Sequence, residues 1–80
     1  MRNKTRYQFD YSKLRKRMRE KYGDMMTFAI TIGMSKNAVS LKFNNHNSFS
    51  QSDIHDWCDY LDIPYTEVGE YFFTPKVKQD

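Results

Sequence analysis

The stretch Asp-Met-Met-Thr-Phe-Ala-Ile-Thr-Ile-Gly-Met-Ser-Lys-Asn-Ala-Val-Ser-Leu-Lys-Phe-Asn-Asn, residues 24–45, decides the fold of this 80-residue chain. Phe28 and Ile32 lie at helical spacing and give a first helix its apolar face. Gly33 supplies the left-handed backbone position that ends a helix, and Ser35 can cap a second helix by accepting a hydrogen bond from a free backbone amide. The pattern therefore predicts a helix-turn-helix, whose second helix can enter the major groove of DNA.

The flanking segments are also expected to be helical. Asp10 is a candidate cap for the helix before the motif, and Ser50 with Asp53 forms a capping box for the helix after it. The expected flanking helices cover residues 11–22, 51–61 and 64–70. The expected organisation is a flexible basic arm (1–8), one helix-turn-helix domain (9–73) and a C-terminal tail (74–80).

The motif and its surroundings resemble a known family. Phe-Ala-Ile-Thr-Ile-Gly-Met-Ser (28–35) and Ala-Val-Ser-Leu-Lys-Phe-Asn-Asn (38–45) are similar to the motif of the lambda-repressor-like Cro and repressor proteins of temperate phages. Phe-Asp-Tyr-Ser-Lys-Leu-Arg (9–15), Leu-Asp-Ile-Pro (61–64) and Tyr-Phe-Phe-Thr-Pro-Lys-Val (71–77) look most like small Cro-like regulators and modulator-of-repression anti-repressors of Gram-positive phages. The resemblance implies an all-α, compact four- to five-helix bundle with an extended aromatic C-terminal tail.

The second helix of the motif, residues 36–44, is the candidate recognition helix. Its outward residues near the N-terminal end can bond DNA bases or a protein partner, and they are Lys36, Asn37 and Ser40. The residues expected to meet phosphates or a partner are Lys42, Asn44, Arg15 and Arg19. The alternative is that these polar residues are ordinary solvent-facing positions, which applies most to Ser40 and Asn44.

Two residues of the motif depart from the pattern of its relatives. Met25 occupies a place where the family usually has a Gln that bonds a phosphate, and a methionine has no donor. Lys42 stands where many relatives keep an apolar core residue, which leaves the rotation of the recognition helix open. The first departure weakens the inference of DNA binding.

The aromatic run Tyr71, Phe72 and Phe73 is a candidate interface, because exposed aromatic patches tend to mark contact surfaces. Three neighbouring aromatic side chains cannot all be hidden behind one small core, so one or two are expected to pack inward. The tail could pair with its copy in a homodimer, as dimeric Cro proteins do by resemblance, or contact another protein.

The net charge of +3 hides a strong asymmetry along the chain. Residues 1–22 carry nine Lys and Arg against two acids, a net of +7, whereas residues 50–80 carry two Lys against seven acids, a net of −5. A basic N-terminal part and an acidic C-terminal part indicate an oriented electrostatic partner. The alternative is that both sets of charges are merely solvated helix faces.

Several functional classes lack the residues that they need. The chain has no Gly-rich phosphate loop, no nucleophile paired with a base and no metal-ligand spacing, so it is not expected to be an enzyme or to take a cofactor, metal or small-molecule substrate. The single cysteine, Cys58, suits a reducing compartment. No apolar run is long enough to span a membrane, and no signal peptide is visible. The expected location is the cytoplasm of the bacterial host.

Two functions remain, and they belong to different classes. The first, slightly favoured by the motif, is a Cro-like transcriptional regulator that binds double-stranded operator DNA in a phage genetic switch. The second is an anti-repressor that binds the DNA-binding domain of the phage's own repressor, with its acidic C-terminal part standing in for DNA phosphates. One face of the motif could serve both partners.

Overall fold

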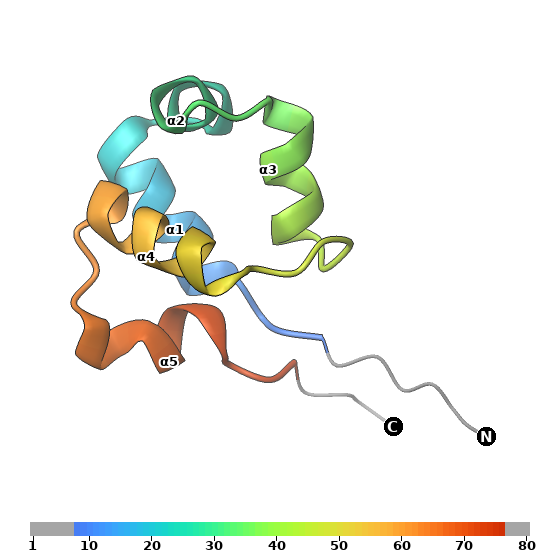
Figure 1. The fold of residues 1–80 in the computed structure, drawn as a ribbon, viewed down its shortest axis with the longest axis vertical. Helices are drawn as coiled ribbons and strands as arrows, with labels where there is room; N and C mark the ends of the chain where they lie inside the picture. Colours follow the sequence, from blue (N-terminus) through green and yellow to red (C-terminus); the bar gives the residue numbers. More distant parts are fainter. Residues whose placement is uncertain (1–7, 77–80) are drawn as a thin grey trace.

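Five α-helices and one short 3₁₀-helix pack around a single core in the computed structural model, which describes residues 8–76 (Figure 1). The elements are α1 (Ser12–Tyr22), α2 (Met25–Ile32), α3 (Lys36–Phe43), α4 (Gln51–Leu61), η1 (Tyr65–Glu67) and α5 (Val68–Phe72). The all-α expectation is confirmed, since β-pairing within the described range is limited to an isolated bridge between Phe9 and Pro75. None of these helices is both long and apolar enough to cross a membrane. Residues 1–7 of the expected arm and 77–80 of the expected tail lie outside the described residues.

Helix α1 begins one residue later than the sequence predicts. Tyr11 occupies the cap position and makes no side-chain cap bond, so the prediction of Asp10 as the cap is wrong. The Asp10 carboxylate instead accepts hydrogen bonds from the hydroxyl (2.6 Å) and the backbone amide (2.9 Å) of Ser12, which lower the pKa of Asp10. Leu14 and Met18, which lie one helical turn apart, are fully buried and form the side of α1 that faces the core.

Helices α2 and α3 meet at the turn that the sequence predicts. Asp24 caps α2 by accepting from the amide of Thr27 (2.8 Å), and Ser35 caps α3 by accepting from the amide of Ala38 (3.0 Å). Gly33 between them has φ +78°, the left-handed conformation that favours glycine. In Figure 1, α2 is seen end-on while α3 runs across the view, so the two helices cross steeply.

Helix α4 closes the core from the C-terminal side. Its start is the predicted capping box, in which Ser50 accepts from the amide of Asp53 and the Asp53 carboxylate accepts from the amide of Ser50. Trp57, Cys58 and Leu61 are buried at helical spacing. Cys58 is a free thiol inside this core, and burial raises its pKa.

The aromatic run of residues 71–73 does not form the expected extended tail, but the expectation that one or two of its side chains pack inward is confirmed. Tyr71 and Phe72 belong to α5 and are buried, because α5 packs against α1 and α4. Phe72 makes an edge-on contact with Phe49, with 5.1 Å between ring centroids. Only Phe73, which follows the helix, remains 49% exposed.

The two ends of the described chain lie side by side against the bundle. The amide of Asp10 donates to the carbonyl of Thr74 (2.8 Å) beside the bridge from Phe9 to Pro75. On the other side, the Asn45 side chain accepts from the Phe9 amide (2.9 Å) and donates to the Phe9 carbonyl (3.0 Å). The segment around Phe9 is thereby held between the end of α3 and the residues after α5.

Trp57 lies at the centre of an aromatic cluster that joins three parts of the chain. Its ring makes edge-on contacts with Phe28 of α2 (4.9 Å), Phe43 of α3 (5.5 Å) and Phe49 before α4 (4.8 Å between centroids). Aromatic pairs in this geometry contribute energy beyond the area that they bury. The cluster therefore sets how the α2–α3 pair sits against α4.

Candidate functional site

The N-terminal end of α3 presents two polar side chains to solvent. Lys36 and Asn37 are exposed and Ser40 is half-buried. Their orientation follows from the opposite side of the helix, where Val39 and Phe43 are buried in the core. The structure therefore brings Lys36 and Asn37 to the surface, as the sequence predicts, while their contacts with bases or a partner remain a prediction.

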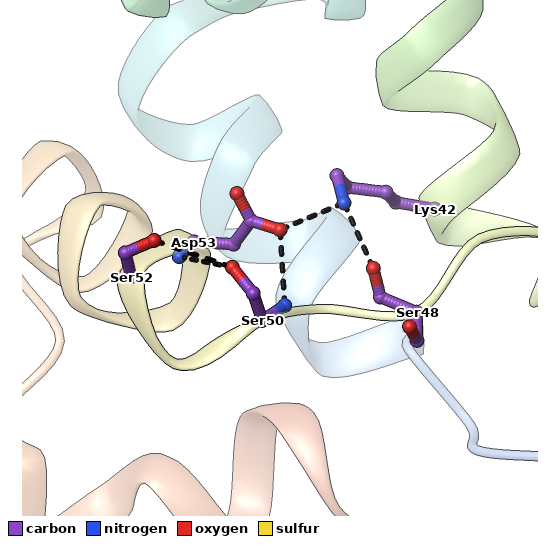
Figure 2. A network of polar contacts seen from close by, with 5 residues as sticks. All are labelled: Lys42, Ser48, Ser50, Ser52 and Asp53. Atoms are coloured by element: carbon purple, nitrogen blue, oxygen red, sulfur yellow. Dashed lines mark hydrogen bonds and ion pairs between the residues drawn. The ribbon is translucent and has the colours of Figure 1, made fainter.

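Lys42 does not belong to this surface, and its assignment to phosphate or partner contact is wrong (Figure 2). Its ammonium donates to the carbonyl of Ser48 (2.9 Å) and to the carboxylate of Asp53 (2.8 Å), and its side chain is only 11% exposed. Figure 2 shows one Asp53 oxygen lying between the Lys42 ammonium and the Ser50 amide. Because Lys42 is itself buried and its ammonium has these two partners, its stem follows the inner side of α3 and its charge is satisfied internally.

The environment of Asp53 predicts a pH dependence of stability. Burial acts to raise the pKa of Asp53, but the hydrogen bonds from Lys42 and from the Ser50 amide outweigh it and hold the pKa below 3.8. A lowered pKa stabilises the fold above the ordinary value, and that contribution disappears as the pH falls through the folded-state pKa. We expect Asp53→Asn to be clearly less stable than the wild type at pH 7, with a difference that shrinks below pH 3.8. Urea denaturation at a series of pH values measures this difference in stability. A difference that does not change with pH would contradict the lowered pKa of Asp53.

Arg15 and Asn44 are engaged with each other at the junction of α1 and α3. The Arg15 guanidinium donates to the Asn44 side-chain oxygen (3.2 Å) and lies 4.9 Å above the Phe43 ring. The Asn44 amide also donates to the Ser40 hydroxyl (3.3 Å). Arg19, one turn further along α1, is exposed. The structure thus brings Arg15, Asn44 and Ser40 together, and it leaves Arg19 outside this network.

The buried aromatic residues of α5 cannot serve as the predicted interface. The Tyr71 hydroxyl accepts from Arg17 (3.1 Å), and the Lys13 ammonium lies 4.8 Å above the Tyr71 ring. Phe73 packs edge-on against Phe9 with 5.8 Å between ring centroids, and its exposed part is what remains of the predicted aromatic surface.

Helix α2 carries an exposed apolar surface that the sequence reasoning missed. Met26 is 50% and Ile30 is 71% exposed, and the two residues are one helical turn apart. Met25, beside them, packs partly against the core. The amino-acid composition of α2 could have revealed this surface, because six of its eight residues are apolar and one helix face cannot bury them all.

A groove between the α2–α3 turn and α4 was also missed. Its apolar part is formed by Ile32, Met34 and Trp57, and carboxylates of α4 lie along its border, among them Asp56 and Asp59. Its volume is about 360 Å³. The sequence predicts an acidic C-terminal part, but not carboxylates next to an apolar groove. Within residues 8–76, no three His, Cys, Asp or Glu side chains form a group suited to a metal ion.

Comparisons with known proteins agree with this geometry. The family model described as "Protein of unknown function (DUF739)" matches residues 7–75. The solution structure of the modulator of repression of the temperate bacteriophage TP901-1 from Lactococcus lactis is 34% identical, with a TM-score of 0.76 over 88% of this chain and 95% of that one. A comparison with curated proteins gave no significant match. The chain therefore belongs to the DUF739 family and is a phage modulator-of-repression-like protein.

Proposed function

We propose that this protein is the anti-repressor of a phage genetic switch, which binds the phage's repressor protein and hinders its binding to operator DNA. The observation that carries the proposal is the similarity to a modulator of repression, at 34% identity over nearly the whole of both chains. It acts by binding rather than by catalysis, in the cytoplasm of the bacterial host. The motif alone slightly favours operator binding, whereas this similarity favours the anti-repressor function.

The surface of α2 supports a protein partner over DNA. In a helix-turn-helix docked on a duplex, the first motif helix crosses the phosphate backbone. On this helix, Met26 and Ile30 expose thioether and hydrocarbon groups, and neither side chain has a donor for a phosphate oxygen. Exposed apolar side chains of this kind suit the apolar part of a protein interface.

Binding to the repressor can be measured directly. The purified protein is mixed with the N-terminal DNA-binding domain of the repressor of the same phage, and the mixture is analysed by size-exclusion chromatography with light scattering and by calorimetry. We expect a complex at micromolar concentrations. Separate elution of two folded proteins would contradict the proposal.

A second function, operator binding by a helix-turn-helix, is favoured by the exposure of Lys36 and Asn37 at the start of α3. Asparagine can pair bidentately with adenine, and lysine can donate to guanine. On this hypothesis, the Arg15–Asn44 pair and Arg19 lie near phosphates.

The DNA hypothesis predicts a specific loss in one variant. Asn37→Ala should weaken binding to the cognate site by about 1–3 kcal/mol and leave binding to random duplex nearly unchanged. Fluorescence anisotropy on DNA from the phage switch region measures both, with Asn47→Ala as a matched control because Asn47 is an exposed asparagine after α3. Equal affinities of all three proteins for all duplexes would exclude base reading by Asn37.

A further inference from the structure

Lys42 joins α3 to two other parts of the chain. Its ammonium donates to the Ser48 carbonyl, in the segment between α3 and α4 (2.9 Å), and to the carboxylate of Asp53 in the first turn of α4 (2.8 Å). The same ammonium lies 5.2 Å from the centre of the Phe49 ring. Figure 2 shows Lys42 entering this network from α3, whereas the other four labelled residues belong to the connecting segment and to α4. One side chain therefore holds α3 against both.

The apolar residues of α3 specify its orientation less firmly. Val39 and Phe43 are the apolar residues of α3 that are buried. Leu41 follows Val39 by two residues and therefore points to nearly the opposite side of the helix, where it is half-buried. Apolar side chains on two sides of a short helix define its inner face weakly. The contacts of Lys42 supply the direction that the apolar pattern lacks.

A largely buried ion pair is better suited to selecting one arrangement than to adding stability. Taking charges out of water is costly, and replacing a buried pair by apolar residues often leaves stability unchanged or raises it. A buried charge without its partners costs far more. The side chains of Lys42 and Asp53 are only 11% and 32% exposed, so orientations of α3 that part the ammonium from its acceptors are disfavoured.

We propose that Lys42 is a positioning residue, which fixes the orientation of α3 against α4 and thereby the placement of Lys36 and Asn37 for a partner. Lys42 does not touch the partner, because its ammonium is turned inward. Lys36 and Asn37 are exposed at the other end of the same eight-residue helix, so a change in the orientation of α3 moves both. The expected effect on affinity rests on the proposed function, whereas the orientation of α3 can be measured without a partner.

Residual dipolar couplings measure the orientation of α3 relative to α4 directly. Lys42→Met keeps the stem of the side chain and removes its charge, and we expect its couplings no longer to fit the wild-type arrangement of the two helices. Lys42→Arg keeps a charged donor for the same two acceptors and should restore that fit. Lys16→Met, at an exposed lysine of α1, removes the same charge and serves as the matched control.

The same four proteins are then titrated with the repressor's N-terminal domain by calorimetry. We expect the Kd to rise about tenfold in Lys42→Met and to stay within about twofold of the wild type in Lys42→Arg and Lys16→Met. Circular dichroism establishes that each protein is folded. If Lys42→Met does not fold, Lys42→Gln takes its place with the same expectations, because it also keeps part of the stem and removes the charge.

The outcomes separate this inference from the proposed function. Wild-type couplings in Lys42→Met overturn the inference, whatever the affinities are. Failure of the wild type to bind the repressor domain overturns the proposed function and does not affect the measured orientation of α3. An altered orientation in Lys42→Met with an unchanged Kd overturns the role of Lys42 in placing the binding surface.

Discussion

Trp57→Ala should lower the free energy of unfolding by about 3–5 kcal/mol, one of the largest effects expected of a single truncation in this chain. Trp57 is 1% exposed and its ring touches Phe28, Phe43 and Phe49, so truncation leaves a cavity where α2, α3 and α4 meet. Domains of this kind have a total stability of roughly 5–15 kcal/mol, so the variant should be partly unfolded near physiological temperature.

The measurement is urea denaturation followed by far-ultraviolet circular dichroism, because the substitution removes the tryptophan fluorescence. Tyr65→Ala is the matched control, since Tyr65 is an aromatic residue 61% exposed outside the core. Its effect should stay within about 0.5 kcal/mol. A loss in Trp57→Ala no larger than in the control would show that the aromatic cluster does not hold the helices together.

Asp53→Ala should lower the free energy of unfolding by about 3 kcal/mol, because one carboxylate performs two tasks. It completes the capping box at the start of α4, and it neutralises the largely buried ammonium of Lys42 (Figure 2). The substitution leaves that ammonium with the Ser48 carbonyl as its remaining protein partner among the described residues.

A double-mutant cycle tests the pairing of Lys42 with Asp53. Lys42→Met keeps the stem of the side chain and removes its charge, so Lys42→Met/Asp53→Ala should lose clearly less stability than the sum of the single losses. Asp59→Ala, an exposed acid on the same helix, serves as the control and should change stability by no more than about 0.5 kcal/mol. Strict additivity would mean that the contact between Lys42 and Asp53 contributes nothing to stability.

The groove lies beside the end of α3 that operator binding would use. Met34 lines the groove, and Lys36 and Asn37 follow it by two and three residues at the start of α3. A duplex at the start of α3 would therefore come near a part of the molecule bordered by Asp56 and Asp59. This arrangement favours a basic protein over DNA as the partner.

The sequence by itself determined the features that depend on near neighbours in the chain. The end of α2 follows from Gly33, the start of α3 from Ser35, and the start of α4 from the Ser50–Asp53 capping box. Each can be predicted because caps and turns form within a few residues. The exposure of Lys36 and Asn37 could be predicted in the same way, from the apolar spacing on the other side of their helix.

Tertiary structure alone decided the features that depend on residues far apart in the chain. Lys42 sits at a helix position that could face either way, and only the approach of Ser48 and Asp53 turns its charge inward. Tyr71 and Phe72 are buried because α5 folds back onto α1 and α4, which no local pattern specifies. The groove forms where the α2–α3 turn meets α4, so its apolar floor and its carboxylates come together only through packing.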